Sequence, residues 1–199
     1  MKRIGMSGAI LAGGASARMG HDKALLGFGA ATLLEHLSAV VASVFEEHLV
    51  IVNDRSKTER LALCGARVYE DLVKARGPMG GVYTALEYAR FDACCVLTCD
   101  MPYVDDVFIR QFLGFWEASD DALCAQDRAG KWHPFPGIYR SSVSGMLRSL
   151  LDRGQASMHQ FLDRVHVKPL ALQEERVLYN MNTPADYYFV LRERAGVEP

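Results

Sequence analysis

The sequence contains no long hydrophobic run and little cysteine, although half of its 199 residues are hydrophobic. A membrane-spanning helix requires about 20 consecutive apolar residues, and no segment approaches that length. The five cysteines are an odd number, and they do not form the two C-x-x-C pairs that hold many structural zinc ions. We therefore expect a protein that has no disulfide bonds, lies in the reducing cytoplasm and has no membrane partner.

An excess of charge of one sign is also missing. The 22 Lys and Arg residues nearly balance the 24 Asp and Glu residues, which leaves a formal net charge of -2. Proteins that bind nucleic acid by its phosphates need a basic surface, and this composition provides none. The balance of charge favours a small-molecule ligand over nucleic acid.

The N-terminus imitates a signal peptide without matching the whole pattern. Lys2 and Arg3 precede a weakly apolar stretch that ends in Ala15-Ser16-Ala17, which resembles a cleavage site. Four glycines interrupt this stretch, and each costs about 1 kcal/mol in a helix interior. We therefore interpret the segment as part of the folded protein.

Short apolar runs alternate with helical patterns in the first half of the chain, which is typical of a parallel sheet covered by helices. Strands are predicted at 6–12, 49–53, 67–70, 93–98, 122–126 and 134–139. Helices are predicted at 33–45, 57–63, 81–88, 107–116, 143–151 and 158–162. A last helix should begin at Thr183-Pro184, with a hydroxyl N-cap and proline at the first helical position. The length and the absence of a linker predict one α/β domain over residues 1–199.

A glycine-rich segment connects the first predicted strand to its helix, and it reads Gly13-Gly14-Ala15-Ser16-Ala17-Arg18-Met19-Gly20-His21-Asp22-Lys23. Because glycine lacks Cβ, backbone N–H groups here can approach an anion closely. The segment is neither a Walker A loop nor a dinucleotide fingerprint, since Lys23 does not directly follow a glycine and no G-x-G-x-x-G occurs. Two adjacent glycines alone would fit an ordinary turn, but Arg18 and Lys23 favour a phosphate-binding loop.

The segment Leu11 to Lys23 resembles the signature of the molybdenum cofactor guanylyltransferase family, Leu-Ala-Gly-Gly-x-Ser-x-Arg-Met-Gly-x-Asp-Lys. Further segments resemble that family in the same order: Val52-Asn53, Glu70-Asp71, Gly77 to Gly81, Cys99 to Pro102 and Asn180 to Pro184. The resemblance implies a Rossmann-like, three-layer nucleotidyltransferase fold with a mostly parallel sheet. Residues 1–102 would form its nucleotide-binding half, and residues 103–199 its acceptor-side half.

The resemblance also implies roles for individual residues. The implied nucleotide-binding residues are Leu11, Ala12, Gly13, Gly14, Lys23, Asn53, Asp71, Pro78, Gly80 and Asp100. Arg18, Lys23 and Asp100 would be catalytic, and Asp100 would also bind Mg²⁺. A carboxylate at the carboxyl end of a parallel strand suits Mg²⁺, although Asp100 would equally fit a cap for the turn before Pro102.

The implied acceptor-binding residues are His133, Asn180 and Asn182. A lone histidine and asparagines before a helix also have ordinary structural roles, and this alternative stays open. The implied reaction transfers GMP from GTP to molybdopterin or Mo-molybdopterin and releases pyrophosphate, with transient contact to proteins that make or accept the molybdenum cofactor. The alternatives are a cytidylyl- or sugar-phosphate nucleotidyltransferase on the same fold, and a non-catalytic nucleotide-binding regulatory subunit.

Overall fold

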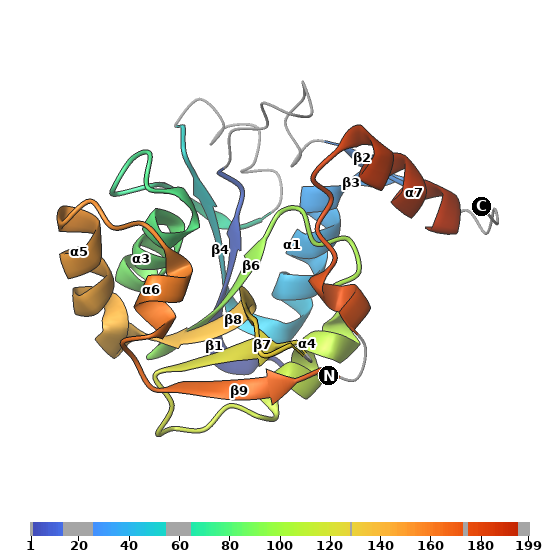
Figure 1. Cartoon of the computed structure of the whole chain (residues 1–199). Helices are drawn as coiled ribbons and strands as arrows, with labels where there is room; N and C mark the ends of the chain where they lie inside the picture. The colour runs from blue at the N-terminus through green and yellow to red at the C-terminus, as the bar shows by residue number, and fades with distance from the viewer. Residues whose placement is uncertain (1, 14–25, 55–64, 128, 173–174, 195–199) are drawn as a thin grey trace.

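The computed structural model describes residues 2–13, 26–54, 65–127, 129–172 and 175–194. Within them lies a seven-stranded sheet with the order β5-β4-β1-β6-β8-β7-β9 (Figure 1). Its strands are β1 (Ile4–Leu11), β4 (Phe45–Val52), β5 (Arg67–Glu70), β6 (Ala93–Thr98), β7 (Ala122–Gln126), β8 (Trp132–Arg140) and β9 (Val167–Ala171). The helices are α1 (Leu33–Val44), α3 (Gly77–Tyr88), α4 (Asp106–Leu113), η4 (Ser141–Val143), α5 (Ser144–Asp152), α6 (Met158–Leu162), η5 (Glu175–Leu178) and α7 (Pro184–Arg194).

The sheet is parallel in its N-terminal half and mixed beyond β6. β1 pairs in parallel with β4 and β6, and β4 pairs in parallel with β5. β8 runs antiparallel to both β6 and β7, whereas β9 pairs in parallel with β7. The predicted mostly parallel α/β sheet is confirmed. β9 was not predicted, because it contains Pro169 and proline argues against a strand. Proline is tolerated chiefly in edge strands, and β9 lies at the edge of the sheet.

Helices cover both faces of the sheet, and each face has its own core (Figure 1). Side chains alternate along β1, so that Ile10 packs in the cluster with α1 and α4, while Ala9 and Leu11 pack in the cluster with α3, α5 and α6. The predicted three-layer fold is therefore confirmed. Among the helices of the described residues, none combines the length and apolar character needed to cross a bilayer.

Most predicted elements lie near their expected bounds, and the exceptions have local causes. Phe45 was predicted at the end of a helix, but α1 ends at Val44 and Phe45 begins β4 with an extended backbone. The helix predicted to end at residue 116 ends at Leu113, because Gly114 takes the C-cap position. α3 begins at Gly77, earlier than predicted. The helix predicted at 57–63 falls outside the described residues.

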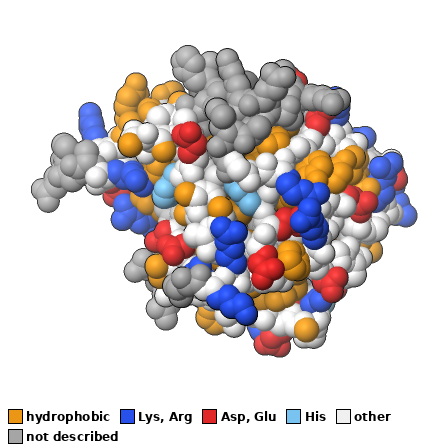
Figure 2. All heavy atoms as spheres, turned by 180° about the vertical axis from the view of Figure 1, so that it is seen from behind, with side chains coloured by type: hydrophobic (Ala, Val, Ile, Leu, Met, Phe, Trp, Pro, Cys, Tyr) orange, Lys and Arg blue, Asp and Glu red, His pale blue; other side chains and the backbone are white. Residues whose placement is uncertain are grey.

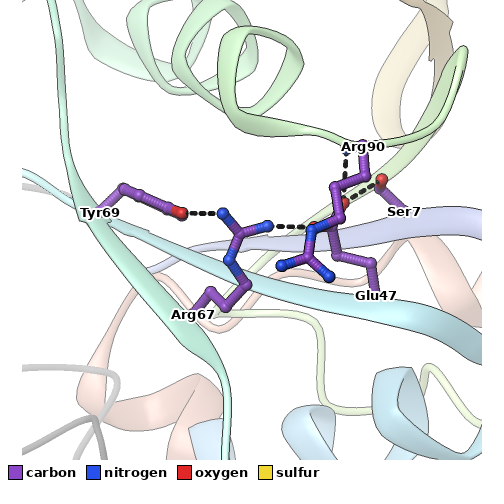
Figure 3. A network of polar contacts seen from close by, with 5 residues as sticks. All are labelled: Ser7, Glu47, Arg67, Tyr69 and Arg90. Atoms are coloured by element: carbon purple, nitrogen blue, oxygen red, sulfur yellow. Dashed lines mark hydrogen bonds and ion pairs between the residues drawn. The ribbon is translucent and has the colours of Figure 1, made fainter.

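A buried carboxylate joins the strands on the α3 face of the sheet (Figure 3). Glu47 in β4 is only 5% exposed and accepts hydrogen bonds from the Ser7 hydroxyl at 2.6 Å and the Arg90 backbone N–H at 2.7 Å. The Arg67 guanidinium donates to the same carboxylate and to the Tyr69 hydroxyl. Glu47 therefore fastens the edge strand β5 to β4, β1 and the segment that follows α3.

The last helix lies apart from the two helical layers and packs on a short hairpin formed by β2 (Gly27–Phe28) and β3 (Ala31–Thr32) (Figure 1). The Tyr187 hydroxyl of α7 donates to the Gly27 carbonyl at 2.8 Å. α7 begins at Pro184 as predicted, with Thr183 and Asp186 exchanging a side-chain to backbone hydrogen bond in each direction.

Charges are mixed over the surface, as the balanced composition predicts. In the view of Figure 2, Lys and Arg side chains lie among Asp and Glu side chains. Exposed ion pairs include Arg148 with Asp152 at 3.0 Å and Arg176 with Glu193 at 2.6 Å. Such pairs contribute little to stability individually, but their mixing keeps the surface close to neutral.

Candidate functional site

The four parallel strands end side by side at one edge of the sheet. Leu11 is in register with Ile51 of β4 and Thr98 of β6, and Val52 is in register with Glu70 of β5. In open α/β sheets, ligands bind outside the carboxyl ends of the strands. The predicted residues that follow these strand ends within two positions are Ala12, Gly13, Asn53, Asp71 and Asp100.

Backbone hydrogen bonds continue past the strand ends and hold the following residues in place. Ala12 and Asp71 each donate a backbone N–H to a carbonyl of β4 at 2.8 Å, and Cys99 donates to the Leu11 carbonyl at 3.1 Å. The first residues of the loops are therefore as well positioned as the strands themselves. The structure brings these predicted nucleotide positions to one edge.

After β1, the backbone at Gly13 passes close to Asn53, which follows β4. A Cβ placed on Gly13 would lie 2.9 Å from the Asn53 backbone nitrogen and 3.2 Å from the Asn53 Cβ. Because a real Cβ does not approach backbone so closely, Gly13 allows the two loops to touch. This explains why a glycine stands directly after Ala12.

The start of α3 lies at the same edge of the sheet and is held by Thr84. The Thr84 hydroxyl accepts a hydrogen bond from the Leu72 N–H at 3.0 Å and donates to the Gly80 carbonyl at 2.9 Å. A Cβ on Gly80 would lie 2.9 Å from the Val73 carbonyl oxygen, so glycine permits this contact. Thr84 is not among the predicted site residues, although a threonine four residues after a helical carbonyl is a known back-bonding pattern.

The N-terminus of α3 presents its first backbone N–H groups at this edge of the sheet. Pro78 occupies the first turn, and within the described residues no side chain caps the helix. The N-terminal N–H groups of a helix and its dipole favour an electronegative partner. Pro78 and Gly80 therefore lie where polar ligand atoms can meet backbone N–H groups.

Asp71 carries an unusual carboxylate. Burial raises its pKa to about 6, the Thr84 hydroxyl lowers it and the neighbouring charge of Glu70 raises it. Its buried Oδ1 accepts no hydrogen bond from the described residues. A buried acceptor of this kind suits a ligand that brings hydrogen-bond donors.

Asp100 lies two residues beyond the end of β6 and contacts the segment before α7. The Met181 backbone N–H donates to the Asp100 carbonyl at 2.9 Å. Met181 is fully buried, whereas Asn180 and Asn182 are exposed on either side of it. The structure thus brings the segment with both asparagines next to Asp100, although Asn182 also gives its backbone N–H to Asp186 at the start of α7.

His133 lies on β8, and β6 separates β8 from the strands β1, β4 and β5 that precede most of the predicted nucleotide positions. Its Nε2 is 3.1 Å from Asp127 Oδ2, and hydrogen bonds from the Lys131 backbone and then from His133 lower the pKa of Asp127. His133 lines a cavity of about 540 Å³. Other residues that line this cavity are Tyr103, Arg176, Tyr179, Phe189 and Glu193.

The sequence does not single out these cavity residues. Their signal is weak, because Tyr103 merely follows Met101-Pro102 and Tyr179 merely precedes Asn180. Aromatic residues beside a motif are more often core residues than ligand contacts. Only the fold brings them to one cavity.

Three predicted residues, Gly14, Arg18 and Lys23, lie outside the described residues. In the described ranges, no group of three His, Cys, Asp or Glu side chains is arranged to hold a metal ion. Asp71 follows β5 and Asp100 follows β6, and β4 and β1 lie between these two strands. Neighbouring strands are about 4.8 Å apart, so the two residues are separated by roughly 14 Å. Asp100 therefore fits a divalent cation that takes its other ligands from substrate phosphates and water.

This fold, with the predicted nucleotide positions at the carboxyl edge of its sheet, is that of the α/β nucleotidyltransferases. The chain belongs to the family described as the MobA-like NTP transferase domain, whose model matches residues 8–169. It is 35% identical over 191 residues to a probable molybdenum cofactor guanylyltransferase of Carboxydothermus hydrogenoformans, covering 92% of this chain and 94% of that protein.

Solved structures share the fold at lower identity. Molybdopterin-guanine dinucleotide biosynthesis protein A of Archaeoglobus fulgidus is similar with a TM-score of 0.84 and 23% identity, covering 96% of this chain and all of that chain. The 4-diphosphocytidyl-2C-methyl-D-erythritol synthase of Anaerococcus prevotii is similar with a TM-score of 0.72 and 10% identity, covering 96% and 98% of the two chains. Because guanylyl and cytidylyl enzymes share this fold, the fold alone does not determine which nucleotide base is bound.

Proposed function

We propose that this protein transfers GMP from GTP to the terminal phosphate of molybdopterin or Mo-molybdopterin, with release of pyrophosphate. The observation that carries the proposal is the convergence of Gly13, Asn53, Asp71 and Asp100 at the carboxyl edge of the sheet. Membership of the MobA-like NTP transferase family supports it. The name of a relative with 35% identity and near-complete coverage favours guanylyl transfer.

The nucleotide would lie across the strand ends. Asp71, Pro78 and Gly80 lie on the β5 and α3 side, where a buried carboxylate oxygen and backbone N–H groups can meet the edge of a guanine ring. Guanine carries both donors and acceptors on that edge, which suits this mixed set. Leu11, Ala12, Gly13 and Asn53 lie between this side and Asp100, and they would contact the ribose.

The reaction needs no protein nucleophile. An oxygen of the acceptor phosphate attacks the α-phosphorus and forms a new P–O bond, while the bond to the β-phosphate oxygen breaks and pyrophosphate leaves with the electron pair. Catalysis of this kind rests on positioning and charge stabilisation. Lys23 would neutralise charge at the α-phosphate, and Arg18 would hold the departing pyrophosphate.

Asp100 would hold Mg²⁺, which neutralises charge on the phosphate oxygens when it is bound. The Asp100 carbonyl accepts a hydrogen bond from the Met181 backbone N–H, and the N–H of the preceding Cys99 donates one to the Leu11 carbonyl. These two hydrogen bonds hold the backbone at Asp100 in place. A carboxylate on a fixed backbone loses little freedom when it binds a cation. His133, Asn180 and Asn182 would contact the acceptor on the far side of Asp100.

We also propose that the protein works in the cytoplasm, with transient contacts to proteins that make or accept the molybdenum cofactor. The small, buried thiols of Cys94, Cys95 and Cys124 support a reducing compartment. The balanced charge of the chain supports small-molecule substrates rather than nucleic acid or a membrane surface.

The test compares nucleotides and one pair of variants. Thermal unfolding is measured with Mg²⁺ and GTP, ATP, CTP or UTP, because a ligand at 100 times its dissociation constant stabilises a protein by roughly 2.7 kcal/mol. Pyrophosphate release is then measured with molybdopterin. GTP should give the largest stabilisation and the fastest release.

Asp100→Asn should abolish turnover while the protein stays folded. Asp92→Asn is the matched control, because Asp92 is exposed and precedes the opposite end of the same strand. Equal stabilisation by GTP and CTP would remove the guanylyl assignment. Binding of GTP without any turnover would instead favour a regulatory subunit.

A further inference from the structure

The segment between β5 and α3, residues 71–76, has a backbone conformation that most residues avoid. Ala75 has a φ of 57°, in the left-handed region that residues with a Cβ rarely adopt. Gly77, which begins α3, has a φ of 59°. A strained conformation of this kind persists only where the surrounding structure holds it. Contacts with the rest of the fold must therefore hold the segment that begins with Asp71.

The hydroxyl of Thr84 supplies two of these contacts from inside α3. Thr84 is fully buried, and its Oγ1 accepts the Leu72 N–H at 3.0 Å and donates to the Gly80 carbonyl at 2.9 Å. Both bonds form at once, because a hydroxyl has one donor and two acceptor positions. The Gly80 backbone also packs on the segment, since a Cβ there would lie 2.9 Å from the Val73 carbonyl oxygen. Thr84 thus fastens the segment to the first turn of the helix.

The residues that Thr84 connects are those proposed to meet the nucleotide base. Asp71 directly precedes Leu72, and Gly80 is itself one of the proposed contacts. The Asp71 N–H donates to the Val52 carbonyl at 2.8 Å, so β4 holds Asp71 on one side and Thr84 holds its neighbour on the other. The Thr84 hydroxyl also lowers the pKa of Asp71, which places it close to that carboxylate.

We propose that Thr84 is a positioning residue for base recognition, which holds the Asp71 carboxylate and the N-terminus of α3 at a fixed separation. Guanine presents N–H donors and a carbonyl acceptor, so the carboxylate and the helix N–H groups can bind it together only at one spacing. The inference rests on the proposed function, because it takes guanine as the base. Thr84 itself contacts no reacting atom and acts through Asp71 and Gly80.

Two substitutions separate the hydroxyl of Thr84 from its size. Thr84→Val puts a methyl group in place of the hydroxyl and so removes both hydrogen bonds, whereas Thr84→Ser keeps the hydroxyl and loses the methyl group. Isothermal titration calorimetry with Mg²⁺ measures the binding of GTP and of inosine triphosphate (ITP), which lacks the 2-amino donor of guanine. Wild type should prefer GTP about tenfold, the scale of one hydrogen bond to a charged group.

Thr84→Val should bind GTP about tenfold more weakly than wild type and prefer it over ITP by no more than about twofold, because the carboxylate is no longer aligned. Thr84→Ser should keep both the affinity and the preference within about threefold of wild type. In GMP transfer, Thr84→Val should raise KM for GTP about tenfold and leave kcat within about twofold, since Thr84 acts on the base and not on the phosphates.

Ser7→Ala is the matched control, because it also removes a fully buried hydroxyl. The Ser7 hydroxyl donates to Glu47, and Ser7 lies four residues before the carboxyl end of β1. Urea unfolding should show a loss of stability in Ser7→Ala as in Thr84→Val, but Ser7→Ala should bind GTP and ITP as wild type does. If Thr84→Val does not fold, Thr84→Ala is compared with Thr84→Ser, since these two differ only by the hydroxyl.

The inference is overturned if wild type binds GTP and ITP equally, or if the variant without the hydroxyl keeps the wild-type preference. It is also overturned if Thr84→Ser or Ser7→Ala loses as much preference as that variant does. GMP transfer by wild type with GTP and with CTP is measured separately. If wild type transfers GMP but the hydroxyl has no effect on the preference, the role of Thr84 fails and the proposed function stands. If wild type transfers no GMP, the proposed function fails by itself.

Discussion

The backbone of Gly13 lies so close to Asn53 that a side chain has no room there. Overpacking of a fixed contact by one methyl group costs about 1–3 kcal/mol. We expect Gly13→Ala to push the two loops apart and raise the dissociation constant of GTP about tenfold. Isothermal titration calorimetry with GTP and Mg²⁺ measures this change.

Gly145→Ala is the control for this substitution. A Cβ on Gly145 would meet no atom of the described residues within 4 Å, and the position lies in α5. Alanine there should leave GTP affinity unchanged and raise stability by at most about 1 kcal/mol. If Gly13→Ala binds GTP as tightly as Gly145→Ala does, the contact with Asn53 has no role in binding.

Asp71 should make stability depend on pH. Its pKa is raised to about 6 in the folded protein, above the value near 4 of an unfolded chain, so the folded state favours the protonated form. This contribution to stability is complete below pH of about 4 and is lost as the pH rises through about 6. At neutral pH the buried charge is therefore a cost to the fold.

Asp71→Asn removes that charge. After allowance for partial solvent screening, it should raise the free energy of unfolding by about 1 kcal/mol at pH 7.5 and by almost nothing at pH 4. Urea unfolding at the two pH values measures the difference, with the exposed Asp92→Asn as control. A variant that is less stable than wild type at pH 7.5 would contradict the assignment of the raised pKa.

At the scale of elements, a buried carboxylate adds side-chain contacts to the ladder that joins the edge strand β5 to β4. Glu47 receives hydrogen bonds from Ser7 on β1, from Arg67 on β5 and from the backbone of Arg90 (Figure 3). Without Glu47 the Ser7 hydroxyl and the Arg90 backbone N–H lose their acceptor, which costs about 1–3 kcal/mol, whereas the side chains of Arg67 and Arg90 are 39% and 69% exposed and can be hydrated. We expect Glu47→Ala to lower the free energy of unfolding by this amount, as measured by urea denaturation.

The neighbour Glu46 provides a matched control on the same strand. It is exposed, whereas Glu47 is buried, because successive residues of a strand face opposite sides. Glu46→Ala should change the free energy of unfolding by less than about 0.5 kcal/mol. Similar losses in the two variants would show that the network does not stabilise β5.

At the scale of the whole molecule, the sheet joins the two halves of the chain. β6 of the first half pairs with β8 of the second half, so one ladder crosses the boundary at residue 102. We therefore expect one cooperative unfolding transition, as small single domains usually show. Fluorescence of Trp116 and Trp132 reports the second half, and circular dichroism reports the whole chain.

The two signals should give the same urea midpoint, and GTP with Mg²⁺ should move both together. The proposed nucleotide contacts lie in the first half, so a shift of the tryptophan signal would report coupling through the sheet. Separate midpoints would contradict the prediction of a single domain over 1–199.

The sequence by itself determined the strands and turns that depend on neighbouring residues. The bounds of β5, β6 and β7 and the start of α7 follow from apolar runs and from capping residues such as Thr183, which act over a few positions. The alternation of Asn180, Met181 and Asn182 was likewise predictable, because an extended backbone places successive side chains on opposite sides.

Only the tertiary structure decided which distant residues meet. Tyr103, Tyr179 and Phe189 share a cavity because β6, the segment before α7 and α7 itself come together, and no local pattern encodes that meeting. Thr84 and Glu47 gain their roles in the same way, from loops and strands far along the chain. Short-range periodicity reflects backbone geometry, whereas the energy of these contacts exists only once the sheet has assembled.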